Sequence, residues 1–111
     1  LLTPSSIAQA ASEDLIQPAW KVSIVYGMPC AVYHQFPACY YLAARFADNF
    51  ESAVLHAING GGQNMARAML TGALVGAQVG INGIPQRFID GLDNSDALLA
   101  RARQLSSKIN T

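Results

Sequence analysis

Charged side chains are scarce in this sequence. Only 13% of its 111 residues are Asp, Glu, Lys or Arg, and the seven basic residues balance the seven acidic ones. An average globular domain carries about 25% charged residues, so this chain has roughly half the usual number. The basic residues form no cluster, which argues against nucleic acid as a partner, because binding to a phosphate backbone requires a basic patch. We therefore expect much of the surface to be covered, either by a missing N-terminal half or by other protein subunits.

Cysteines and long apolar runs are also few. Cys30 and Cys39 are nine positions apart, a spacing that matches neither a redox pair nor a zinc site. We predict two buried free thiols, which favours an intracellular location. Residues 68–85 carry no charge but are interrupted by Thr71, Gln78 and other polar residues. This stretch falls short of the roughly 20 apolar residues that a membrane span needs, so a membrane protein is not expected.

Helix signals dominate the first half of the chain, and the pattern predicts one all-α domain over residues 1–111. Thr3 and Pro4 form a helix start, because a hydroxyl can cap the helix and proline is tolerated in the first turn. We expect Pro18 to end that helix. Apolar residues alternate after Trp20 and are followed by Gly27 and other breakers, so residues 20–32 are predicted to be extended or irregular. Pro37 is expected to open the next helix.

The second half predicts four more helices. Asn49 is expected to cap a helix that ends at Asn59, and a long helix follows from about Asn64 to Val79. A short helix is predicted over residues 86–92, and a final amphipathic helix over about 95–109 is expected to dock on the core. In the long helix three glycines lie four residues apart, and their small size should allow another helix or backbone to approach closely. These packing candidates are Gly72, Gly76 and Gly80.

Few residues in the sequence suggest chemistry. His34 and His56 lack neighbours at metal-ligand spacing, and Asp48 and Glu51 are better interpreted as residues flanking a helix start than as an acid–base pair. The uncommon feature is a run of three glycines, at 60–62, that opens a helix. A helix N-terminus presents unpaired N–H groups that can hold an anion or orient a ligating side chain. The ligand-binding candidates are Asn59, Gly61, Gly62, Gln63 and Asn64.

This glycine run and the helix after it resemble the C-terminal signature of the ADP-ribosylglycohydrolase family, which includes crystallin J1. In that family an Asn-x-Gly-Gly-Asp motif opens a helix containing Gly-Ala-Leu-x-Gly-Ala, and an Ile-Pro turn follows. Here residues 59–80 and the turn at Ile84-Pro85 match in order, and the resemblance covers about residues 27–92. It implies that this chain forms the C-terminal helices of a larger helical fold. It also implies cleavage of a glycosidic bond to ADP-ribose with two magnesium ions.

The sequence departs from the family pattern at the metal motif. Gly61 and Gly62 match the two glycines, but Gln63 stands where the first acidic ligand belongs, and Met65 replaces a second Asp of many members. A glutamine carbonyl coordinates magnesium weakly, and a thioether is a soft ligand that magnesium avoids. The family's N-terminal Gly-Asp motif is not among these residues.

Three functions remain open from the sequence. The first is a catalytically degenerate scaffold that serves as a structural or assembly element and uses no cofactor in this part of the fold. The second is a magnesium-dependent hydrolase of ADP-ribosyl bonds whose remaining ligands lie outside these residues, in which Gln63 holds a weakened metal position. The third is an unrelated small helical subunit.

Overall fold

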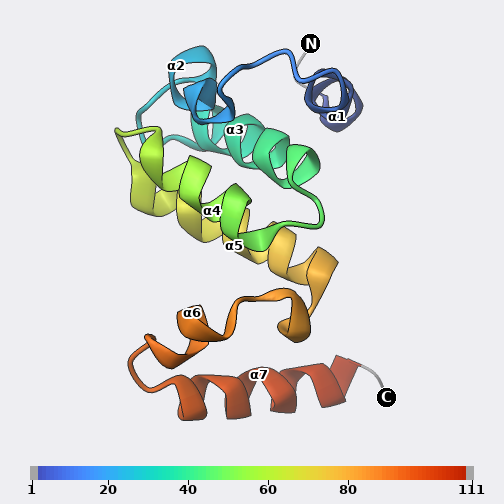
Figure 1. The fold of residues 1–111 in the computed structure, drawn as a ribbon, viewed down its shortest axis with the longest axis vertical. Helices are drawn as coiled ribbons and strands as arrows, with labels where there is room; N and C mark the ends of the chain where they lie inside the picture. Colours follow the sequence, from blue (N-terminus) through green and yellow to red (C-terminus); the bar gives the residue numbers. More distant parts are fainter. Residues whose placement is uncertain (1–2, 110–111) are drawn as a thin grey trace.

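The computed structural model describes residues 3–109 of the chain (Figure 1). Every regular element in that range is helical, so the prediction of an all-α fold is confirmed. Two of the elements are short 3₁₀ helices, η1 and η2. In chain order the elements are α1 (Pro4–Ser12), η1 (Ala19–Lys21), α2 (Val22–Tyr26), α3 (Val32–Arg45), α4 (Phe50–Asn59), α5 (Asn64–Val79), η2 (Ile81–Gly83), α6 (Gln86–Asp90) and α7 (Ser95–Ile109).

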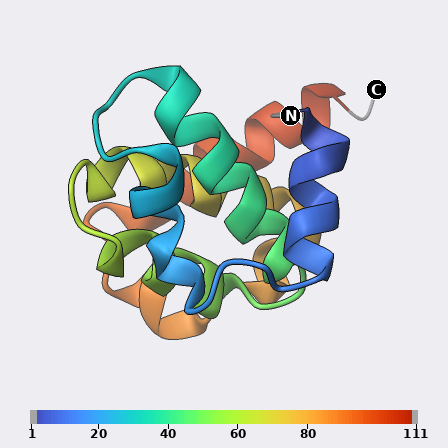
Figure 2. The same cartoon turned by 90° about the horizontal axis from the view of Figure 1, so that it is seen from above.

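The body of the molecule is built around α3, which packs against α1, α2, α4 and α5 (Figures 1 and 2). Its core consists of small and medium apolar side chains from these helices, with Tyr41 as the largest. A smaller cluster formed by Ala43, Ala53 and Val75 lies where α3, α4 and α5 meet. Because most of these side chains are short, the helix axes can lie close together. No helix in residues 3–109 is both long enough and apolar enough to cross a membrane.

Two predicted helix starts are confirmed by their capping hydrogen bonds. The amide of Ser6 donates to Thr3 Oγ1 over 3.2 Å, and the amide of Ser52 donates to Asn49 Oδ1 over 3.0 Å. The prediction that Pro18 ends this first helix is wrong, because α1 ends at Ser12, well before that proline.

The prediction that residues 20–32 are extended or irregular is wrong for their first part. Residues 19–26 form η1 and α2, and only the segment from Gly27 onward is irregular. The reason is burial, since Val22 and the adjacent Ser23 are both fully buried. Consecutive strand residues point to opposite faces, whereas a helical turn brings both side chains into the interior.

The predicted start of the next helix is also wrong, because α3 begins at Val32 and Pro37 lies inside it. Proline in the sixth position removes one backbone hydrogen bond, the one its N–H would give to the carbonyl of Tyr33. Pro37 itself is buried, so its ring contributes to packing.

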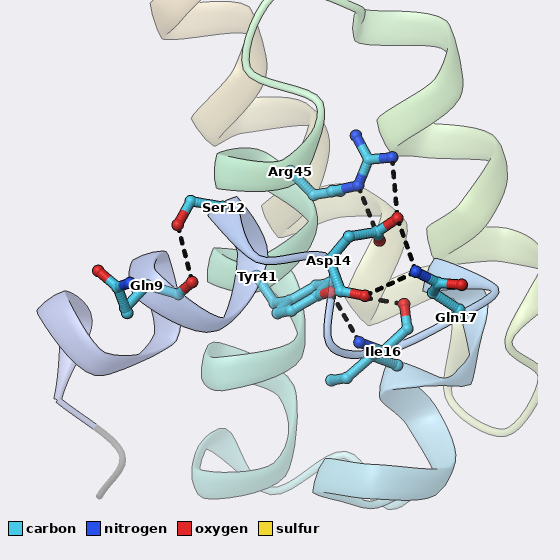
Figure 3. Close-up of polar contacts among 7 residues, drawn as sticks. All are labelled: Gln9, Ser12, Asp14, Ile16, Gln17, Tyr41 and Arg45. Carbon is cyan, nitrogen blue, oxygen red and sulfur yellow. Dashed lines mark hydrogen bonds and ion pairs between the residues drawn. The ribbon is translucent and has the colours of Figure 1, made fainter.

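A polar cluster holds the segment after α1 against α3 (Figure 3). Arg45 Nε donates to Asp14 Oδ1 over 3.0 Å, and Gln17 Nε2 donates to Asp14 Oδ2 over 3.1 Å. The hydroxyl of the buried Tyr41 accepts a hydrogen bond from the amide of Ile16 over 3.1 Å. These contacts tie the loop to the C-terminal end of α3.

The C-terminal helices are attached to the body through α6. Arg87 forms an ion pair with Glu51 of α4, and the ring of Phe88 meets the edge of Phe50 with centroids 6.0 Å apart. The predicted docking of the final helix on the core is wrong, since α7 has no buried residue. Figure 1 shows α7 beyond α6, away from the body. Its apolar stripe is therefore uncovered, and Leu105 is 61% exposed.

Candidate functional site

The predicted ligand-binding residues lie together at the junction between α4 and α5, residues 59–64. Asn59, Gln63 and Asn64 are exposed there, while Gly60 is buried. Gly61 and Gly62 have φ angles of +74° and +63°, in the left-handed region that glycine adopts readily. These two residues turn the chain from the end of α4 into the start of α5.

A buried arginine donates hydrogen bonds to this junction from the interior of the fold. Arg67, in the first turns of α5, has no solvent exposure. Its Nε donates to the carbonyl of Ala57 over 2.8 Å, and its Nη2 donates to the carbonyl of Gly61. The side chain thus reaches back from α5 and links the last turn of α4 to the glycine turn.

Residues of α2 and of the loop after it form hydrogen bonds with the junction. Ser23 Oγ donates to the carbonyl of Gly60 over 2.6 Å, and the amide of Gln63 donates to the carbonyl of Met28 over 3.1 Å. A β-carbon on Gly62 would lie 2.6 Å from Cβ of Met28, so only glycine fits between these two segments. The loop after α2 and the junction are therefore packed backbone to backbone.

The carbonyl groups of the junction are turned toward these internal donors. Besides the bonds from Arg67 and Ser23, the carbonyl of Gly62 accepts from the amide of Asn64 over 2.8 Å, and the carbonyl of Gln63 accepts from the amide of Arg67 over 3.2 Å. Backbone oxygens that could otherwise bind a hard cation thus already have hydrogen-bond donors.

Burial shapes the electrostatics beneath the junction. Burial lowers the pKa of the Arg67 guanidinium. Within residues 3–109 the ion pairs are Arg45–Asp14 and Arg87–Glu51, so neither provides a carboxylate for Arg67. The thiol of Cys39 donates to the carbonyl of Arg67 over 3.3 Å, and burial raises the pKa of that thiol.

Both cysteines are free, as predicted, but only Cys39 is buried. Cys30 is exposed, because it lies in the irregular loop between α2 and α3.

The donor groups at the junction do not suit magnesium. The two positions that the resemblance assigns to acidic ligands carry the neutral amide of Gln63 and the thioether of Met65. Met65 is 77% exposed. No group of three or more His, Cys, Asp or Glu residues that could hold a metal exists in the part of the chain that the structure describes. Hard divalent cations favour several carboxylate and carbonyl oxygens, and this junction offers one uncharged side-chain oxygen at the key position.

The glycine row of α5 lies partly against α4. β-Carbons built on Gly72 and Gly76 would lie 3.7 and 3.8 Å from side-chain atoms of Val54 and Phe50, which is ordinary van der Waals contact. Gly80 follows the end of α5 and has no neighbour within 4 Å of such an atom. The first two glycines thus face the neighbouring helix with space for a methyl group, and the third lies outside this contact.

Comparison with known families connects these features. The model of the ADP-ribosylglycohydrolase family matches residues 3–111, which is nearly the whole chain and more than the sequence motifs alone covered. The chain belongs to the ADP-ribosylglycohydrolase family. Searches of curated proteins and of solved structures gave no significant match.

Sequence reasoning missed two residues of this ADP-ribosylglycohydrolase-family junction, Arg67 and Ser23. A signal for the first was present, because Arg67 is the sole charged residue between Ser52 and Gln86. A lone charge in a long uncharged segment is a candidate for a buried role, since paired or hydrogen-bonded arginines are the ones found in protein interiors. Ser23 carried no comparable signal, because its partner is 37 residues away.

Proposed function

We propose that this chain is a C-terminal part of an ADP-ribosylglycohydrolase fold that has lost the metal site at its glycine junction and serves as a structural or assembly element. The observation that carries the proposal is the chemistry of the junction. Gln63 and Met65 supply no negative charge, and the carbonyls of Ala57, Gly60 and Gly61 are used by Arg67 and Ser23.

The retained parts of the motif are those that pack, which supports this role. Gly62 leaves no space for a side chain beside Met28. The carbonyl of Gly61 accepts a hydrogen bond from Nη2 of Arg67. Both serve the connection between α2, α4 and α5 whether or not a ligand binds. Selection for packing would therefore keep the glycines while the acidic ligands were replaced.

A second candidate function is a hydrolase whose metal ligands come from residues outside this chain. The exposure of Gln63 and Asn64 at the start of α5 favours it, because an added segment could approach their side chains there. In that case ADP-ribose would bind with magnesium at this junction.

Calorimetric titration of the complete polypeptide with magnesium and ADP-ribose distinguishes the two functions. For a lost metal site we expect no heat of coupled binding, since no carboxylate balances the charge of the cation. The double variant Gln63→Asp/Met65→Asp should gain weak magnesium binding, because it places two carboxylates at the start of α5. Asn82→Asp/Gln86→Asp adds the same charge elsewhere and is the matched control, for which no binding is expected. Micromolar ADP-ribose binding by the unaltered complete polypeptide would contradict the proposal.

A further inference from the structure

We draw no further inference here: the strongest candidate, the hollow of about 530 Å³ between the η2–α6 segment and α7, is an open groove in which the exposed Arg103 is the sole charged lining residue, and nothing in the structure selects an occupant for it.

Discussion

At the scale of single residues, the junction depends on Arg67 and Gly62. Arg67 donates two hydrogen bonds to the carbonyls of Ala57 and Gly61 from a fully buried position. These two bonds offset part of the cost of removing the guanidinium from water, although its Nη1 has no hydrogen-bond partner within residues 3–109. Gly62 contributes through its lack of a side chain, which lets the loop containing Met28 pass directly against it.

Alanine substitution separates backbone strain from steric contact at the two junction glycines. Gly61→Ala and Gly62→Ala both place a β-carbon on a residue with positive φ, which costs about 1–2 kcal/mol. At Gly61 the added atom has open space, but at Gly62 it would lie 2.6 Å from Cβ of Met28. We expect Gly61→Ala to lower the free energy of unfolding by about 1 kcal/mol, and Gly62→Ala by about 2–4 kcal/mol because overpacking adds to the strain. Urea denaturation measures both, and equal losses would show that the contact with Met28 is not tight.

At the scale of helices, local signals predicted starts better than ends. Thr3 and Asn49 cap α1 and α4 through bonds within three residues, so both could be recognised in the sequence. The helical state of residues 19–26 and the start of α3 depend on burial against distant segments, whereas α1 ends in a local turn in which Asp14 has a φ of +52°. Pro37 misled the prediction because its burial within α3 outweighs the one lost backbone hydrogen bond.

Alanine substitution in the glycine row of α5 should raise the stability of the protein at one position and lower it at another. Gly76→Ala adds a methyl group 3.8 Å from Phe50, which is ordinary contact, and alanine favours a helix over glycine by about 1 kcal/mol. Gly80 follows the helix with φ of +73° and ψ of 176°, a backbone region that essentially only glycine adopts, so Gly80→Ala should lose about 1–3 kcal/mol to backbone strain. Thermal or chemical denaturation should therefore show a more stable Gly76→Ala and a less stable Gly80→Ala. A marked loss in Gly76→Ala would mean that α4 and α5 approach more closely than these distances indicate.

At the scale of the whole molecule, charges and apolar surface are segregated. The two ion pairs lie at the outer end of α3 and between α4 and α6, and charged residues are frequent in α7. The outward side of α5 and the junction at residues 59–64 carry no exposed charged residue. The low charge content of the sequence therefore has a location, which is the outward side of α5 together with the junction.

The separation of α7 from the body predicts that its removal costs little. A chain ending at Asn94 loses a helix with no buried residue and keeps the contacts of α6 with Phe50 and Glu51. We expect the free energy of unfolding of the body to change by less than about 1 kcal/mol, as for other surface changes. Chemical denaturation followed by circular dichroism checks this, and a loss well beyond that value would show that α7 contributes to the core.

The sequence by itself determined the helical fold class, the helix caps, the family and the position of the glycine junction. These features depend on the order and spacing of nearby residues, which fix local backbone preferences and motifs. Only the tertiary structure decided that Arg67 supports the junction, that Ser23 and Met28 hold it from the side, and that α7 remains outside the core. Each of these depends on burial or on contacts between segments far apart in the chain, and the energy of such contacts outweighs local preference where the two disagree.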